Sequence, residues 1–362
     1  MYRLISAKTL LMICVFVSLT ISPTAHLSTL QGTTTDMDGL GLVKIGGRWC
    51  YLGMNGKMVI TSRFKKADPF SQGLAGVFIN GKWGFIDNTA KLVIQPQFSS
   101  VNPFREELAS VEIDGKWGFI DRLGNLVVPI RFDNAYSFNE GFALVMIQGR
   151  WGYINKAGEM VIRPQFTECL HFSEGMAGFS IDGKWGFLDR TGAIVIDRQF
   201  DNVLPFTEGL ASVSINGKIG FINRIGNLVI APQFDNASYF REGLASVSID
   251  GKWGYIDPHG SMIIAPQFDR AIPFKRGLAK VKVAGKWGFI DRSGNFVITP
   301  QFDEAFNFTY DRASIKINGK WGYINKQGEQ LVSPFFEKAF PFTSGKYRNA
   351  SDTETISDDQ MY

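Results

Sequence analysis

The side chains of this 362-residue sequence that come closest to a catalytic pattern are glutamates that precede a recurring Gly-Leu step. Two carboxyl groups at the right separation can hydrolyse a glycosidic bond. A catalytic pair normally breaks the symmetry of a repeat at one place, whereas these acids recur. We therefore expect solvated turn residues rather than a catalytic centre. The glutamates are Glu106, Glu107, Glu140, Glu174, Glu208 and Glu242.

Metal ligands are scarce in the sequence. The three histidines are His26, His171 and His259, and no His-x-x-x-His pair, paired CxxC motif or phosphate-binding glycine loop is present. The loop that starts at Asp291 carries several oxygen-bearing side chains, but aspartate commonly begins a turn by bonding its own backbone. A calcium site needs several converging carboxylates. We assign no catalytic, cofactor-binding or metal-binding residue, and we expect a protein that has no cofactor and is not an enzyme.

A binding surface is the remaining chemical candidate. On the first strand of each repeat, the residues that alternate with the apolar ones change gradually, from apolar in the third unit to cationic near the end. Solenoid proteins bind extended partners on such surfaces, and packing of these residues against an adjacent sheet is an equally strong alternative. The pairs are Ser110 and Glu112, Leu144 and Met146, Ser212 and Ser214, Ser246 and Ser248, Lys280 and Lys282, and Ser314 and Lys316.

These residues are positioned by a repeat of 34 residues. All eight tryptophans share this spacing, and Ile219 occupies the one vacant position. A glycine follows each tryptophan except Trp49, which precedes Cys50. Because a glycine inside a strand permits close approach of another group or marks a bulge, we expect an aromatic ring of the neighbouring repeat to lie over it. The tryptophans are Trp49, Trp83, Trp117, Trp151, Trp185, Trp253, Trp287 and Trp321.

Each repeat has the pattern of short strands joined by tight turns. In the copy that begins at Leu244, apolar and serine residues alternate up to Asp250-Gly251. Alternation of period two indicates a half-buried strand, and Asp-Gly or Asn-Gly between two such runs is a strong hairpin signal. A looser turn and a third strand follow, and the rest of the unit looks like an irregular bridge or a short fourth strand. Four recurring glycines exclude the helical tetratricopeptide array, which has the same period.

The sequence therefore predicts an all-β fold of nine tandem 34-residue three-stranded meander repeats. One unit buries too little apolar surface to fold alone, so neighbouring units must share a core. The array is either an open β superhelix or solenoid, or a propeller-like array. Nine units exceed the usual four to eight blades of a propeller, and 34 residues leave little room for four full strands. We therefore favour the open form.

The ends of the chain differ from the repeat array. Arg3 and Lys8 precede an apolar run over residues 10–19, a layout typical of a secretory signal. An uncleaved anchor is the alternative. We expect a signal peptide or anchor at residues 1–25, a polar lead at 26–39, the array at 40–345 and a disordered acidic tail at 346–362. Cys50 and Cys169 lie in different repeats, so no internal disulfide is expected.

The phrase Gly-Lys-Trp-Gly-Phe/Tyr-Ile-Asp, followed by Val-Ile-x-Pro-Gln-Phe-Asp, resembles the WG-repeat family, also described as KWG repeats. The match covers residues 40–345. The resemblance implies a β-rich tandem array that is common in bacterial proteins and often exported, with no shared catalytic residues. The departures are Ile219, Cys50 and Ile130-Arg131, which affect local packing rather than membership.

The functional expectation is a non-enzymatic exported scaffold that binds a protein or a cell-surface polymer. A propeller-shaped hydrolase acting on polysaccharide and a structural envelope component are the alternatives. The formal charge of +4 is small for this length, and no basic run supplies a phosphate track, so a nucleic-acid partner is not expected. Membrane contact is expected only through an uncleaved N-terminal segment, at a periplasmic, extracellular or cell-surface location. The oligomeric state is left open.

Overall fold

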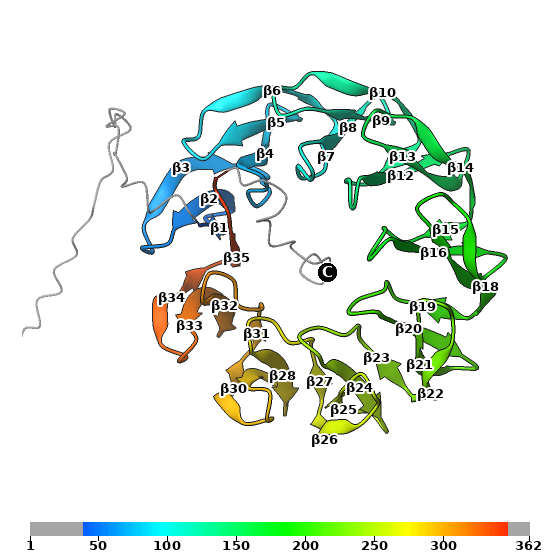
Figure 1. The fold of residues 1–362 in the computed structure, drawn as a ribbon. Helices are drawn as coiled ribbons and strands as arrows, with labels where there is room; N and C mark the ends of the chain where they lie inside the picture. Colours follow the sequence, from blue (N-terminus) through cyan, green and yellow to red (C-terminus); the bar gives the residue numbers. More distant parts are fainter. Residues whose placement is uncertain (1–38, 347–362) are drawn as a thin grey trace, which may run out of the picture. The chain divides into compact units, whose positions relative to one another are not determined.

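The computed structural model describes residues 39–346, which form 35 strands and no helix. The strands make nine antiparallel sheets that follow one another around a ring (Figure 1). This part of the chain is a nine-bladed β-propeller. With no helix in it, residues 39–346 contain none that could span a membrane. The predicted signal peptide, polar lead and acidic tail lie outside the described residues, apart from the bordering Gly39 and Lys346.

The blades are numbered 1 to 9 in chain order, and their strands are given from the inner to the outer edge. Blade 1 consists of β35 (Lys338–Thr343), β1 (Leu40–Ile45), β2 (Arg48–Gly53) and β3 (Met58–Phe64); blade 2 of β4 (Leu74–Ile79), β5 (Lys82–Asp87) and β6 (Leu92–Phe98); and blade 3 of β7 (Ser100–Val101), β8 (Ala109–Ile113), β9 (Lys116–Ile120) and β10 (Leu126–Phe132).

Blade 4 consists of β11 (Asn134–Ala135), β12 (Phe142–Ile147), β13 (Arg150–Asn155) and β14 (Met160–Phe166); blade 5 of β15 (Glu168–Cys169), β16 (Met176–Ile181), β17 (Lys184–Asp189) and β18 (Ile194–Phe200); and blade 6 of β19 (Asn202–Val203), β20 (Leu210–Ile215), β21 (Lys218–Asn223) and β22 (Leu228–Phe234).

Blade 7 consists of β23 (Asn236–Ala237), β24 (Ala245–Ile249), β25 (Lys252–Ile256) and β26 (Met262–Phe268); blade 8 of β27 (Arg270–Ala271), β28 (Ala279–Val283), β29 (Lys286–Ile290) and β30 (Phe296–Phe302); and blade 9 of β31 (Glu304–Ala305), β32 (Arg312–Ile317), β33 (Lys320–Asn325) and β34 (Gln330–Phe336).

The ring is closed by the two ends of the repeat array. Strand β35 pairs antiparallel with β1, so that the last strand of the array completes the first blade (Figure 1). The preference for an open superhelix is therefore wrong, and the propeller-like alternative is confirmed. Four strands fit into 34 residues because the innermost strand is only two residues long in blades 3 to 9. In blade 2 it is reduced to a single bridge between Ala67 and Val77.

Two tight turns in each repeat save further residues. The predicted hairpin between the second and third strands is present, with positive φ at both Asp114 (50°) and Gly115 (76°). A second turn of the same kind joins the first two strands, for example at Glu140 (51°) and Gly141 (84°). Two central residues with positive φ define the type I′ turn, whose twist matches that of the flanking strands. The connection between the second and third strands is therefore only two residues long, whereas the second turn lies within a six-residue connection, from β11 (ends at Ala135) to β12 (begins at Phe142).

The glycine after the tryptophan is explained by a bulge in its own blade. Between β9 and β10 the register shifts twice, and the extra residues of β10 pass over Gly118. A Cβ on Gly118 would lie 2.5 Å from the carbonyl oxygen of Val128 and 2.9 Å from the nitrogen of Ile130. The expected aromatic ring from a neighbouring repeat is therefore wrong. The sequence pattern identified the close approach but not the group that makes it.

The hydrophobic core lies between successive blades. A Phe or Tyr on the third strand of each blade contacts a Phe that follows the innermost strand of the next, for example Phe119 and Phe138 with ring centroids 4.9 Å apart. The same pair closes the ring between Tyr323 of blade 9 and Phe342 of blade 1, again at 4.9 Å. Tilted and edge-on aromatic pairs at this distance are favourable. Each blade is thus stabilised by both neighbours, as expected for units that cannot fold singly.

Candidate functional site

The ring has two faces of different chemistry. The hairpin face carries the turns between second and third strands together with the connections to the next blade. The loop face, at the opposite ends of the strands, carries the turns between first and second strands and between third and fourth strands.

Cys50 and Cys169, in blades 1 and 5, are both free thiols, and burial raises the pKa of Cys169 to about 12.

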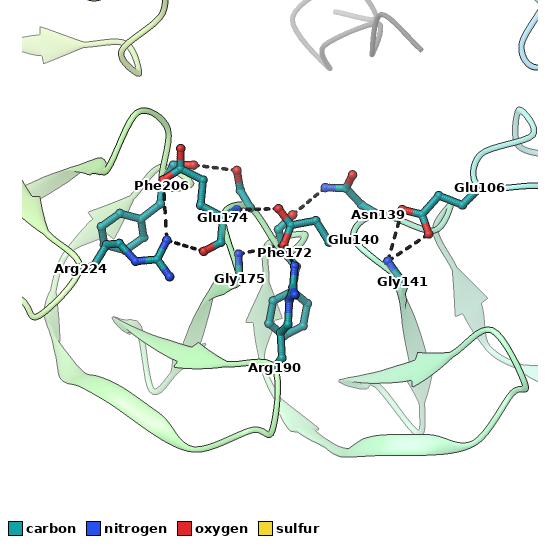
Figure 2. A network of polar contacts seen from close by, with 11 residues as sticks. Glu106, Asn139, Glu140, Gly141, Phe172, Glu174, Gly175, Arg190, Phe206 and Arg224 are labelled. Carbon is teal, nitrogen blue, oxygen red and sulfur yellow. Dashed lines mark hydrogen bonds and ion pairs between the residues drawn. The ribbon is translucent and has the colours of Figure 1, made fainter. Parts of the chain in front are cut away.

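The candidate glutamates lie on the loop face, where they connect one blade to the next. Figure 2 shows Glu140 accepting hydrogen bonds from the backbone N–H groups of Glu174 (2.6 Å) and Gly175 (2.8 Å) in blade 5, and an ion pair with Arg190 (2.9 Å). Glu106 likewise accepts from the N–H of Gly141 in blade 4 (Figure 2). A carboxylate that accepts backbone N–H groups satisfies donors that the turn leaves unpaired.

The same contact recurs around the loop face. Glu174 accepts from Gly209, Glu208 from Gly243, and Glu242 from Gly277, all at 2.9–3.0 Å. Five of the six glutamates thus form hydrogen bonds between blades rather than being simply solvated, and at Glu107 the backbone N–H donates to Gln72 of the preceding blade (2.8 Å). The asymmetric pair of acids that a hydrolase would need is not found among them. A loop-face pocket of about 340 Å³ includes Glu174, Arg190 and Arg224, and its two arginines are already bonded to glutamates.

The aspartates of the outer turns bond their own backbone. Asp291 accepts hydrogen bonds from the N–H groups of Ser293 (2.9 Å) and Asn295 (3.0 Å), and the bond from Asn295 holds the pKa of Asp291 below its ordinary value. His259 lies in the corresponding turn of blade 7, and His171 contacts the ring of Tyr136. Within residues 39–346, no three His, Cys, Asp or Glu side chains are grouped so that they could hold a metal ion.

On the hairpin face, aspartates join successive blades. Asp201 follows blade 5 and accepts a bond from Lys184 Nζ of blade 5 (2.6 Å) and from the hairpin N–H of Asn216 in blade 6 (2.8 Å). The bond from Lys184 is the main cause that lowers the pKa of Asp201. We call this arrangement the carboxylate clamp. It recurs at Asp133, Asp235, Asp269 and Asp303, and Glu337 accepts from the hairpin N–H of Gly47 at the closure.

The predicted binding face is partly buried between blades. Of the predicted pairs, the first residues Ser110, Leu144, Ser212, Ser246 and Ser314 are all buried. Ser110 donates to the carbonyl of Ala135 in the next blade, and half-buried Lys280 donates to the carbonyl of Ala305 in blade 9 (2.6 Å). The alternative of packing against an adjacent sheet therefore holds for these positions. The second residues lie near the hairpin face, where Lys282 and Lys316 are half-buried and Ser248 is buried.

Ring closure places further cations beside Lys282 and Lys316. In each blade, one residue of the second strand lies directly opposite one of the innermost strand, just below the hairpin face. These pairs are Arg270 and Lys282 in blade 8, Glu304 and Lys316 in blade 9, and Lys338 and Lys44 in blade 1. Lys66 and Phe78 are the corresponding residues of blade 2, joined by a backbone hydrogen bond. We call the six basic residues of these four contiguous blades the basic sector.

The corresponding pairs in blades 3 to 7 contain two acids and no cation. They are Ser100 and Glu112, Asn134 and Met146, Glu168 and Ser180, Asn202 and Ser214, and Asn236 and Ser248. The inner rim is thus positive on one side only. The sequence pattern identified the lysines of blades 8 and 9 but not Arg270, whose two-residue strand shows no periodicity. It also did not identify Lys44, Lys66 and Lys338, which come near blades 8 and 9 only in the closed ring.

Aromatic rings hold the lysines of the basic sector. Lys338 Nζ lies 5.0 Å from the ring of Trp321 and 5.7–5.8 Å from those of Phe340 and Phe306. Lys44 lies over Trp49 (5.7 Å). Lys66, Lys282 and Lys316 lie over Phe78, Trp287 and Trp321. Lys316 also forms an ion pair with Glu304 of its own blade (2.6 Å). A cation–π contact orients an ammonium group without cancelling its charge, so Lys44, Lys66, Lys282 and Lys338 remain able to bind an anion.

A pocket of about 370 Å³ opens on the hairpin face between blades 1 and 2. Its cationic residues are Arg48, Arg63 and Lys65, and its apolar wall is formed by Phe64, Phe78 and Ile79. The hairpin Asn80-Gly81 completes the lining. Lys65 occupies the position that Asp201 and its counterparts hold at other boundaries. The pocket lies beside the basic sector, since Lys66 follows Lys65 in the chain.

Comparison with known proteins agrees with this architecture. The family model described as WG containing repeat matches residues 51–83, 83–117, 117–151, 151–185, 185–218, 219–253, 253–287, 287–321 and 321–349. No curated protein matches the chain.

Among solved structures, a crystal structure of the eukaryotic initiation factor is similar with a TM-score of 0.61 and 10% identity, over 84% of this chain and 97% of that one. Dihydro-heme d1 dehydrogenase NirN in complex with DHE has a TM-score of 0.48 and 12% identity, over 85% of this chain and 75% of that one. At these identities the first likeness concerns the fold alone. The nine family matches span most of the sequence, and the chain therefore belongs to the family of proteins built from WG-containing repeats.

Proposed function

We propose that this protein is a non-enzymatic, exported scaffold that binds an acidic partner through the basic sector of its hairpin face. The observation that carries the proposal is the presence of two like-charged pairs directly across adjacent strands, Lys44 with Lys338 and Arg270 with Lys282. Like charges in this position destabilise a sheet. A bound anion gives a physical reason for two such pairs in one part of the rim.

The geometry of the basic sector favours an extended acidic polypeptide over a small ion. Its cations are spread over four contiguous blades, so one compact ligand cannot reach all of them. Aromatic rings beneath the lysines provide apolar contact for the neighbouring side chains of a peptide. Complementary charge also increases the rate of association and makes it depend on salt.

Export is the second part of the proposal. It rests on the charged and then apolar sequence of residues 1–25, which has the layout of a secretory signal. Sequencing the N-terminus of the protein recovered from outside the cytoplasm is the test. A mature chain that begins after the apolar run supports export with cleavage, and a full-length chain confined to the cytoplasm contradicts it.

Charge reversal in the basic sector tests the binding proposal. In the double variant Lys44→Glu/Lys282→Glu, each new glutamate faces a cation, Lys338 or Arg270, and forms a favourable pair. We expect the affinity for a fluorescently labelled hexaglutamate peptide to fall at least tenfold, measured by anisotropy at low salt. We expect the melting temperature to stay equal or rise, because two repulsive pairs become attractive.

The matched control is Lys57→Glu/Lys91→Glu, which makes the same change of net charge on exposed residues of the loop face. Its affinity for hexaglutamate should stay within about twofold of the wild type. Equal losses in both double variants, or no salt-dependent binding by the wild type, would contradict the proposal. Binding of oligogalacturonate in place of hexaglutamate would assign the basic sector to a surface polysaccharide instead.

A further inference from the structure

We infer that the pocket between blades 1 and 2 is a binding site for a carboxylate group of an acidic polypeptide. The inference rests on the proposed function for the identity of the partner, since this pocket would anchor the polypeptide that the basic sector attracts. The site itself is deduced from the carboxylate clamps at the other blade boundaries.

The clamps show what the fold places at this position. At Asp201, one carboxylate oxygen accepts from Lys184 of the preceding blade and the other accepts from the hairpin N–H of Asn216 in the following blade. Aspartate occupies the position at five boundaries and Glu337 at the closure. A cation on one side and hairpin N–H donors on the other therefore form a seat that suits a carboxylate.

Between blades 1 and 2 this seat keeps its donors but has no acid. Arg48 stands at the position of Lys184, and the hairpin Asn80-Gly81 has φ values of 51° and 87°, close to the 51° and 76° of Asn216-Gly217. The residue at the position of Asp201 is Lys65, and Arg63 adds a third cation to the same pocket. Within residues 39–346, Arg48, Arg63 and Lys65 form no ion pair.

Two other blade boundaries also lack an acid at this position. They differ from the boundary between blades 1 and 2, because each keeps a neutral side chain that accepts the hydrogen bond. Ser99 and Thr167 hold the position between blades 2 and 3 and between blades 4 and 5. Their hydroxyl groups accept from Lys82 (3.2 Å) and Arg150 (3.1 Å), so a neutral acceptor replaces the carboxylate. Only between blades 1 and 2 is the charge reversed. Arg48, Arg63 and Lys65 are exposed and line one pocket, so they are accessible to an anion from outside the clamp.

The lining specifies the chemistry of the ligand. Besides the three cations and the hairpin N–H groups, Asn80 is the one side chain of the pocket that accepts hydrogen bonds. This donor-rich lining fits a carboxylate, which only accepts, better than the many hydroxyl groups of a neutral sugar. Half-buried Phe78 and Ile79 form an apolar wall, which suits a residue beside the acidic one. Arginine also binds carboxylates with two parallel hydrogen bonds.

The decisive experiment places a carboxylate of the protein itself in the pocket between blades 1 and 2, by substitution of Lys65. In Lys65→Asp, the new carboxylate should accept from Arg48 and the hairpin of blade 2, as Asp201 does in its own clamp. We expect a higher melting temperature together with at least a tenfold loss of affinity for labelled hexaglutamate. In the wild type, the amide NMR signals of Asn80 and Gly81 should shift when hexaglutamate is added.

Two controls separate the clamp from the change of charge. Ser99→Asp installs a clamp between blades 2 and 3 and should raise the melting temperature with binding within about twofold of the wild type. Lys91→Asp makes the same charge change as Lys65→Asp on the loop face and should leave binding equally unchanged. A stabilised Lys65→Asp variant that still binds hexaglutamate like the wild type would overturn the inference.

The outcomes also distinguish this inference from the proposed function. If Lys44→Glu/Lys282→Glu loses binding and Lys65→Asp does not, the basic sector stands and the pocket is wrong. If Lys65→Asp alone loses binding, the pocket stands and the wider sector is wrong. Absence of hexaglutamate binding by the wild type, with binding of oligogalacturonate that Lys65→Asp abolishes, would keep the carboxylate seat but overturn the polypeptide as its source.

Discussion

Asp68 is the most unusual ionisable residue of the blade interiors. It follows the reduced inner strand of blade 2, where its N–H donates to the carbonyl of Gly76 and its carbonyl accepts from the hydroxyl of Tyr51. Burial raises the pKa of its carboxyl group to about 7. The other blades have uncharged residues at this position, which are Asn102, Tyr136, Leu170, Leu204, Ser238, Ile272, Phe306 and Phe340.

This elevated pKa makes stability depend on pH. Between about pH 4 and pH 7 the folded protein keeps a proton on Asp68 that the unfolded chain has released. The free energy of unfolding therefore falls as pH rises through this window, and then levels off. Asp68→Asn removes the titration and should stabilise the protein at pH 8, by up to about 4 kcal/mol for a shift of about three units. Near pH 4 the variant and the wild type should differ little.

Urea unfolding of both proteins at pH 4 and pH 8 measures the effect. Other carboxylates titrate equally in the two proteins, so their contribution cancels in the difference between them. The same difference in the free energy of unfolding at both pH values would show that Asp68 is already ionised in the folded state.

At the scale of the single element, the bulged outer strand explains the glycine of the Trp-Gly motif, which is kept in blade 6 although Ile219 replaces the tryptophan there. In blade 6, a Cβ on Gly220 would lie 2.5 Å from the carbonyl oxygen of Ile230 and 2.8 Å from the nitrogen of Pro232. Gly220→Ala should therefore lower the free energy of unfolding by about 1–3 kcal/mol, because backbone atoms of β22 must move. Urea titration of the variant checks this.

Blade 1 offers the control, because it already has a side chain at this position. Cys50 is buried, and its neighbouring strand β3 has Ser62 where β22 has Pro232. Cys50→Ala keeps the Cβ and should cost less than Gly220→Ala. Equal effects of the two substitutions would mean that the bulge does not demand glycine.

The elements were largely predictable from the sequence because they depend on local patterns. The Asp-Gly and Asn-Gly turns fixed the hairpins, and alternation from Leu244 to Ile249 indicated a strand that the structure has as β24 (Ala245–Ile249). The two-residue inner strands were less visible, since two residues show no periodicity. The group that approaches each glycine was not predictable either, because a bulge depends on the register between two strands.

At the scale of the whole molecule, closure was the property that the sequence could not supply. Whether an array of blades closes depends on small angles between neighbours, summed over nine interfaces, and no single residue encodes that sum. For the same reason, only part of the basic sector could be predicted from the sequence. Lys282 and Lys316 were identified from their place in the repeat, whereas Lys44 and Lys338 lie far apart in the chain and face each other only in the closed ring.

Closure also explains why an array with weak individual units is stable. The aromatic contact between Tyr323 and Phe342 and the clamp of Glu337 on Gly47 repeat, between blades 9 and 1, the contacts found at other boundaries. No blade is left with an uncovered apolar side. Unfolding from an end then requires that β35 first separates from β1.

The most direct test is a disulfide across the closure. Lys44 and Lys338 are partners on adjacent antiparallel strands, at a separation that a disulfide can span. In a background with Cys50→Ala and Cys169→Ala, the pair Lys44→Cys/Lys338→Cys should oxidise completely within one chain and raise the melting temperature, measured with and without reductant. Two cysteines that remain free or link different chains would contradict the closed ring.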